Sequence, residues 1–274
     1  MKLVTIGDNV VDRYLDQGRI YPGGNAVNVA VAAKRNGAEN CAYIGITGDD
    51  AAALHVIHSL KMEGIDLAQI RQTYGPNGEA SVTLNEKGDR IFIGTNRGIR
   101  MSSLLQLKLT EPDLAYISTF DMIHTSVNSD IEHELPRLDQ RPVSFDFSTK
   151  NRWNEKYLRR VCPYLAYAFF SGSDMELDEI NALIAYVHEL GVKVVGVTRG
   201  SEAAQFSCEG IRYEQTPLEV DVLDTMGAGD SFIGGFLASY HGTRNMEKAL
   251  QQAAGSAAAT CQHYGAYGYG INME

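Results

Sequence analysis

The chain has 274 residues, of which 44% are hydrophobic and 21% are charged. This apolar content is typical of a folded globular protein and excludes a chain that is mainly disordered, and the length suits one domain over residues 1–274. The 24 basic and 34 acidic side chains give a formal net charge of −10. Such a charge repels polyanions, so we expect neither a nucleic acid nor an anionic membrane as a partner.

The cysteines and the N-terminal segment indicate where the protein works. The four cysteines are far apart and lack the spacing of a metal site or a disulfide framework, so we expect reduced thiols. The first apolar run meets Asp8 too early for a signal peptide, and no run of 18 apolar residues occurs. We therefore expect a cytoplasmic protein.

Short apolar runs alternate with longer helical segments along most of the chain. The first expected strand, residues 3–7, ends in Gly-Asp and would bring Asp8 and Asp12 to its exit from the sheet. The other expected strands are 41–46, 121–126, 143–147, 165–171 and 192–198. The expected helices are 24–37, 50–63, 130–139, 154–161 and 176–190. This alternation predicts an α/β fold whose mostly parallel central sheet is covered by helices on both faces.

Residues 80–94 interrupt this alternation. Two segments of alternating apolar and polar residues flank the sequence EKGD at residues 86–89, a pattern typical of an antiparallel hairpin. Residues 13–21 and 80–97 together would form a small β appendage, which is either inert or a lid over a ligand site. Because unpaired strand edges invite pairing, such a lid favours a homodimer.

The sequence DTMGAGDSF at residues 224–232 precedes a helical run over residues 233–240. The backbone amides of Gly227, Ala228 and Gly229 would lack partners at the start of this helix, where the helix dipole adds partial positive charge. Such a segment can bind a phosphate without Lys or Arg. Asp230 in the first turn is compatible with simple helix stabilisation or with a general base beside the phosphate.

Other phosphate-binding and catalytic motifs are absent. The chain has no GxxxxGK[ST] sequence, and residues 227–232 do not fit GxGxxG. Neither GxSxG nor HExxH occurs. These absences argue against Walker-type ATPases, dinucleotide-binding oxidoreductases, serine hydrolases and zinc proteases.

A second glycine-rich segment, YPGGNAVNVA, covers residues 21–30. A turn followed by a helix cap would explain its glycines and its first Asn. Asn28 lies one turn inside the expected helix from Gly24, and with Asp8 and Asp12 it could provide the amide and carboxylate groups that bind adjacent sugar hydroxyls. Thr198 and Gly200 follow an apolar strand, the position where α/β sheets bind ligands.

Together these two segments resemble the signatures of the ribokinase-like carbohydrate kinase family. Residues 23–28, GGNAVN, are similar to its N-terminal signature, and residues 224–232 to its C-terminal one. The resemblance covers nearly the whole chain. Within the family, residues 5–9, 24–31 and 145–148 most resemble the branch that phosphorylates the glycated amino acid fructoselysine on O6.

This resemblance implies a ribokinase-like α/β domain with a β lid, which transfers the γ-phosphoryl group of ATP, with Mg²⁺, to a primary hydroxyl of a sugar. By position, Asp230 would be the catalytic base, and the amides of residues 227–229 would bind the developing negative charge. The resemblance also implies that Asp12, Gly24 and Asn28 bind the sugar.

The nucleotide and metal sites are implied in the same way. The residues that would border the nucleotide are Ser171, Thr198, Gly200 and Gly255. Where the family usually has Asn-x-x-Glu near the Mg²⁺ waters, residues 171–174 read SGSD, which leaves Asp174 to act on the metal through water. Family members often bind a monovalent cation such as K⁺ beside the position of Asp224.

The expected acceptor is a sugar that carries an amino-acid arm. Asp8 and Asp12 would meet the ammonium group of the arm, and Arg97, in the lid, would meet its carboxylate. Ribose, ketodeoxygluconate or a nucleoside remain alternative acceptors within the family. The alternative of another class is a sugar- or nucleotide-sensing protein without turnover, against which the intact Asp230 argues.

Overall fold

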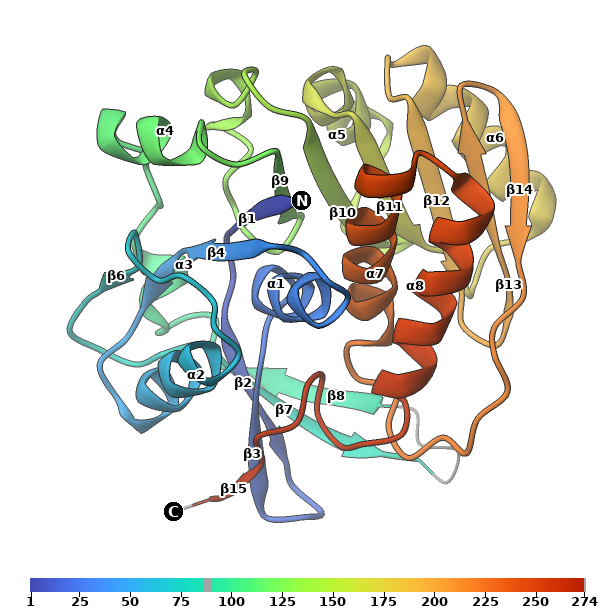
Figure 1. Ribbon diagram of the computed structural model, residues 1–274. Helices are drawn as coiled ribbons and strands as arrows, with labels where there is room; N and C mark the ends of the chain where they lie inside the picture. The colour runs from blue at the N-terminus through green and yellow to red at the C-terminus, as the bar shows by residue number, and fades with distance from the viewer. Residues whose placement is uncertain (86–89, 274) are drawn as a thin grey trace.

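The computed structural model describes residues 1–85 and 90–273, so the turn expected at 86–89 lies outside the described residues. The strands of its large sheet are β1 Lys2–Ile6, β4 Asn40–Ile44, β9 Met122–Ser126, β10 Val143–Thr149, β11 Tyr167–Ser171, β12 Val194–Arg199, β13 Glu202–Cys208 and β14 Ile211–Gln215. Their order is β14-β13-β12-β11-β10-β9-β1-β4 (Figure 1). The six strands from β12 to β4 in this order run parallel, and β13 and β14 extend one edge in antiparallel fashion.

Helices cover both faces of this sheet. Those on one face are α1 Asn25–Arg35, α2 Ala51–Met62, α7 Ala228–Thr243 and α8 Met246–Thr260; those on the other are α4 Glu111–Ile117, α5 Glu155–Val161 and α6 Leu177–Glu189. Successive strand residues point to opposite faces, so Leu3 packs in one apolar core and Val4 in the other. Burial on both faces explains the continuous apolar runs of the parallel strands.

Small residues bring α1, α7 and α8 close together. A Cβ atom added at Gly234 of α7 would lie 2.6 Å from the Cβ of Ala32 in α1. A Cβ atom added at Gly235 would lie 2.9 Å from the Cβ of Ser256 in α8. The two glycines therefore allow α7 to pack between its neighbours, and this packing holds the start of α7 beside the start of α1.

A second group of strands, here called the small sheet, lies below the central sheet in the view of Figure 1. Its strands are β15 Ile271–Asn272, β3 Arg19–Gly23, β2 Val10–Tyr14, β7 Glu79–Leu84 and β8 Arg90–Thr95, in that order. The antiparallel pairing of β7 with β8 confirms the expected hairpin. Ile91, Phe92 and Ile93 are exposed on the edge strand β8. A lid role for this sheet, and a dimer through it, remain predictions.

Most expected elements are confirmed, and the exceptions have physical reasons. The expected helix 130–139 is wrong, because the segment contains only a 3₁₀ turn, Leu135–Arg137, around Pro136, and proline cannot donate to a helix interior. Asp12 lies in β2 of the small sheet and not at the exit of β1. Helix α7 begins at Ala228, five residues earlier than expected.

The four cysteines form no disulfide bond in the structure. Cys41 and Cys162 are buried, Cys208 and Cys261 are partly exposed, and all four are free. Burial raises the pKa of the Cys41 and Cys162 thiols to about 12, so both stay protonated. Among the residues that the structure describes, no helix has both the length and the apolar character needed to cross a membrane.

Candidate active site

Three carboxylates meet around Asn25, the first residue of α1. Its backbone N–H donates to Asp8 Oδ2 at 2.9 Å, and its side-chain Nδ2 donates to Asp146 Oδ2 at 2.8 Å and to Asp230 Oδ1 at 2.7 Å. Asp8 follows β1, Asp146 lies in β10, and Asp230 lies in the first turn of α7. The acids therefore gather at the carboxyl ends of the parallel strands, where α/β sheets bind ligands.

Asp230 is held from α1 by a second amide. Asn28 Nδ2 donates to Asp230 Oδ2 at 2.7 Å, so each carboxylate oxygen receives one amide donor. The other side-chain atom of Asn28, Oδ1, is buried and has no hydrogen-bond partner among the residues that the structure describes. A buried acceptor of this kind requires a donor, and a hydroxyl of a bound sugar would provide one.

A buried histidine fixes the orientation of the Asn25 side chain. His124 Nε2 lies 3.0 Å from Asn25 Oδ1, and its Nδ1 lies 2.9 Å from the hydroxyl of Ser144. Burial lowers the pKa of His124 to about 3, so the ring is neutral. Because Asn25 Oδ1 can only accept, Nε2 carries the proton and Nδ1 accepts from Ser144. The amide nitrogen of Asn25 is thereby turned toward Asp146 and Asp230.

The Asp146 carboxyl group is buried and has a shifted pKa. Burial, followed by the negative charge of Asp230, raises its pKa to about 7, although the backbone N–H of Ser148 donates to its Oδ1 at 2.8 Å. The strand register shifts directly after Asp146, and Ser148 has a φ of 59°. This local irregularity at the end of β10 turns the Ser148 amide back onto the carboxyl group.

The carboxylate of Asp8 accepts hydrogen bonds from the first backbone amides of α1. Its Oδ1 also accepts from the backbone of Ala26 at 3.4 Å and from the hydroxyl of Ser129 at 3.2 Å. The N-cap residue Gly24 makes no side-chain cap, and a Cβ atom added there would lie 2.8 Å from the Cα of Asn9. Gly24 thus permits the close crossing that brings the Asp8 carboxylate to the amides of α1.

The start of α7 presents its amides beside Asp230. Gly227 has a φ of 74°, and a Cβ atom added to it would lie 2.8 Å from the Cα of Ala266. The Ala228 N–H makes a long contact of 3.3 Å with Thr225 O, whereas the first amides of a helix have no acceptor inside it. Gly229 is exposed, and a Cβ atom added there would meet nothing within 4 Å. The geometry fits an anion that approaches the backbone at Gly229.

Asp224 is fully buried and joins three parts of the chain. Its Oδ1 accepts from the Met226 N–H at 2.9 Å, its Oδ2 accepts from the Gly265 N–H at 2.8 Å, and the Tyr14 hydroxyl of β2 also donates to Oδ2. Burial, with the hydrogen bond to Asp224 next, raises the pKa of Tyr14. Asp224 thus connects the small sheet and the C-terminal loop to the turn before α7.

The residues expected at the nucleotide lie at the ends of β11 and β12 and in α8. The Gly172 N–H donates to Thr198 O at 2.8 Å, which links the two strand ends beside Ser171. Asp174 is exposed, as is Gly200, which has a φ of 63°. A Cβ atom added at Gly255 would meet nothing within 4 Å. Within residues 1–85 and 90–273, no three His, Cys, Asp or Glu side chains form a metal-binding group.

The remaining expected sugar contacts, Asp12 and Arg97, lie in the small sheet and directly after its strand β8. Asp12 is buried on β2, where its carboxylate faces the backbone of Gly23. Arg97 forms an ion pair of 3.1 Å with Asp130, and both side chains are half exposed. A contact between Arg97 and a substrate carboxylate would therefore compete with this ion pair.

The geometry agrees with comparisons to known proteins. The family model described as pfkB family carbohydrate kinase matches residues 3–270. The chain belongs to this family. It is therefore a sugar kinase, a phosphotransferase that acts on a sugar hydroxyl. It is 52% identical to the fructosamine kinase FrlD of Bacillus subtilis (strain 168) over 98% of this chain and 94% of that protein.

A fructoselysine 6-kinase of Escherichia coli (strain K12) is 33% identical over 97% of this chain and 99% of that protein. The crystal structure of a fructokinase with bound ATP from Xylella fastidiosa superposes with a TM-score of 0.81, at 20% identity, over 97% of this chain and 94% of that one. This likeness confirms the expected ribokinase-like arrangement of a mostly parallel sheet between helices.

Three residues of the cluster had no assigned role in the sequence interpretation: Asn25, Asp146 and His124. Asp146 could have been predicted as a site residue, because it is an acid inside the apolar sequence FDF. Acids are rarely buried without a partner. His124 likewise interrupts a buried strand. Asn25 gave no separate signal, since a helix-capping turn explains it equally well.

Proposed function

We propose that the kinase transfers the γ-phosphoryl group of ATP to O6 of fructoselysine or a related fructosamine, with Asp230 as the general base. The two relatives named fructosamine kinase and fructoselysine 6-kinase support this acceptor class. The observation that carries the chemistry is the position of Asp230, which two side-chain amides of α1 hold in the same first turn of α7 as the amides of Ala228 and Gly229.

In this proposal Asp230 accepts the proton of the primary hydroxyl as the phosphoryl group moves. The fixed amides of Asn25 and Asn28 keep both carboxylate oxygens in place, so little reorganisation is needed before proton transfer. The amides of residues 227–229 stabilise negative charge that develops on the transferred group. Mg²⁺ bound with ATP would neutralise further charge on the phosphates.

The sugar would lie between the start of α1 and the small sheet. Its hydroxyls would meet Asn28 Oδ1, which lacks a donor among the described residues, and the backbone at Gly24. Asp8 and Asp12 would act on the amino group of the acceptor. The small sheet would serve as the lid of a single domain over residues 1–274, with the exposed edge of β8 available to a second copy.

The nucleotide would lie along the ends of β11 and β12. Ser171, Thr198, Gly200 and Gly255 would border it, and the open space above Gly255 fits a flat base. One exposed carboxylate, Asp174, suits a Mg²⁺ ion that is held mainly by phosphates and water. The oxygens of Asp224 already accept three protein donors, so K⁺ would use them in addition to these bonds.

The test is a phosphorylation assay with a panel of acceptors: fructoselysine, fructosylglycine, fructose, ribose, ketodeoxygluconate and adenosine. We expect the highest kcat/KM with a fructosamine, and a product whose phosphate is assigned to O6 by ³¹P–¹H correlation. A clear preference for ribose, ketodeoxygluconate or adenosine would overturn the acceptor. ATP binding without turnover of any acceptor would instead support the sensing alternative.

A further inference from the structure

A cavity lies beside the carboxylate cluster and has Asp8 in its lining. Its volume is about 210 Å³, and its lining includes Gly7, Asp8, Arg100 and the chain segments 102–107 and 128–130. A cavity of about 150 Å³ already holds a benzene molecule. The space is therefore sufficient for a chain of several non-hydrogen atoms.

Arg100 lines this cavity, and its guanidinium forms no ion pair with the residues that the structure describes. Its side chain is partly buried, and its Nε donates to the Ser103 hydroxyl at 2.7 Å. No carboxylate of the described residues lies within ion-pair distance of it, whereas Arg97 is paired with Asp130. Burial lowers the pKa of Arg100, and the negative charge of Asp8 acts in the opposite direction. A guanidinium has five N–H donors, so most of those on Arg100 remain available to a ligand.

Asn25 connects the lining of the cavity to Asp230, the proposed base. The backbone of Asn25 binds Asp8, which lines the cavity, and its side chain binds Asp230. A sugar whose primary hydroxyl contacts Asp230 would direct its opposite end past Asp8. A substituent on that end would enter the cavity, with an amino group near Asp8 and an acidic group near Arg100.

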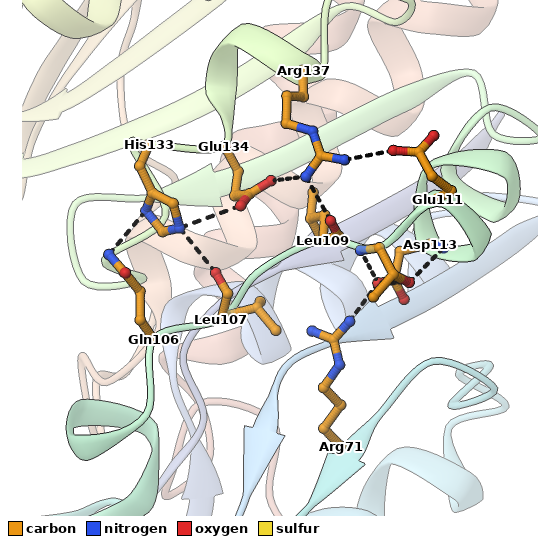
Figure 2. Close-up of polar contacts among 10 residues, drawn as sticks. Arg71, Gln106, Leu107, Leu109, Glu111, Asp113, His133, Glu134 and Arg137 are labelled. Atoms are coloured by element: carbon orange, nitrogen blue, oxygen red, sulfur yellow. Dashed lines mark hydrogen bonds and ion pairs between the residues drawn. The ribbon is translucent and has the colours of Figure 1, made fainter.

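One wall of the cavity, at Gln106 and Leu107, is held by polar contacts with His133 (Figure 2). His133 donates from Nε2 to Leu107 O at 3.1 Å and lies 3.3 Å from the amide of Gln106. Arg137 forms an ion pair of 2.9 Å with Glu134 and also donates to the carbonyl oxygen of Leu109, two residues beyond Leu107. The wall is therefore ordered before a ligand binds, which lowers the entropic cost of binding.

We propose that this cavity binds the amino-acid arm of the acceptor and that Arg100 pairs with its carboxylate, so that this contact selects fructosamines over unsubstituted hexoses. This inference rests on the proposed function. It differs from the sequence expectation, which gave the carboxylate to Arg97. A carboxylate and a guanidinium match in a bidentate geometry, and the carboxylate would satisfy the donors that the protein leaves unused.

The experiment compares kcat/KM for fructosylglycine and fructoselysine, each as the free acid and as the carboxamide. In the wild-type enzyme we expect the free acid of at least one pair to exceed its carboxamide by about 10- to 100-fold, the usual effect of a hydrogen bond to a charged group. Arg100→Gln should lower the free acid to the level of the carboxamide and leave the carboxamide unchanged. Arg100→Lys should restore part of the difference.

Controls separate this selection from other effects. Arg159→Gln removes an exposed arginine of α5 that is paired with Glu155 and should leave every ratio unchanged. A ratio near one for both wild-type pairs would overturn the proposal, and so would loss of the preference in Arg97→Gln while Arg100→Gln retains it. If Arg100→Gln does not fold, the wild-type ratios still test recognition of the carboxylate, and Arg100→Lys tests its assignment to Arg100. Turnover of ribose but of no fructosamine would overturn the proposed function together with this inference.

Discussion

The two sides of the candidate site are built differently. On the acceptor side, Asp146 and Asp230 share the amide of Asn25, and each of these carboxyl groups receives further donors from the protein. On the nucleotide side, Asp174 and Gly200 are exposed. The helix start at Gly229 lies between the two sides and is open above its backbone.

This difference reflects what each side has to do. In the proposed reaction the proton acceptor needs a fixed geometry, and the side-chain amides of Asn25 and Asn28 hold Asp230 in place. A nucleotide brings its own charges and rings, so the protein needs chiefly to leave room for them and to offer backbone donors. Substitutions on the acceptor side should therefore change kcat, whereas those on the nucleotide side should change the affinity for ATP.

The largest effect is expected from Asp230→Asn. Loss of the base should lower kcat by about 10²- to 10⁴-fold, the usual contribution of general base catalysis, while ATP affinity changes little. Steady-state kinetics and calorimetric titration with ATP measure the two quantities. Asp178→Asn, an equivalent change in the first turn of α6, is the matched control. An unchanged kcat in Asp230→Asn would remove the difference between the two sides.

Asp146 should make stability depend on pH. Its pKa of about 7 lies well above the ordinary value of an aspartic acid, so the folded state favours the protonated acid. The free energy that this adds to folding is fully present below pH 4 and is lost as the pH rises to about 7. We expect a slope of up to about 1.4 kcal/mol per pH unit, measured by urea unfolding between pH 5 and 8.

Two variants sharpen this experiment. Asp146→Asn should abolish the slope that Asp146 causes, and Asp230→Asn should move it to lower pH, because the charge of Asp230 is the second cause of the raised pKa. An identical slope in the wild type and in Asp146→Asn would contradict a raised pKa of Asp146.

Gly229→Val tests the junction of the two sides. The added side chain would meet no protein atom at its Cβ, so the melting temperature should stay close to that of the wild type. The same side chain would occupy the approach to the helix amides and should lower ATP affinity by about tenfold or more. Gly227→Val is the contrasting variant, since its positive φ and the contact with Ala266 predict a loss of stability. Normal ATP affinity in Gly229→Val would contradict an anion site here.

The smallest effect is expected from Gly255→Ala on the nucleotide side. Alanine should stabilise α8 by about 0.5–1 kcal/mol, because the new Cβ meets nothing within 4 Å. The KM for ATP should rise by less than in Gly229→Val, and kcat should stay the same. Thermal unfolding and steady-state kinetics check both expectations, and a fall in kcat would contradict the comparison.

The sequence predicts those parts of the molecule that depend on local pattern. The parallel strands and the two glycine-rich helix starts follow from apolar runs and from turn residues, and the structure contains them. The arrangement around Asn25 does not follow, because its partners Asp8, Asp146 and Asp230 come from three distant segments. The expected helix at 130–139 fails because composition alone gave too little weight to Pro136.

The hydrogen bonds to Asp224 couple the position of β2 to the C-terminal loop and to the turn before α7. Tyr14 and the Gly265 amide share one carboxylate with the turn that precedes α7, so a displacement of β2 would pull on the backbone where phosphate is expected. A sugar that binds beneath the small sheet should thus change the affinity of the protein for ATP, and ATP should change the affinity for the sugar by the same factor. Sugar and nucleotide would then bind synergistically, each raising the affinity for the other.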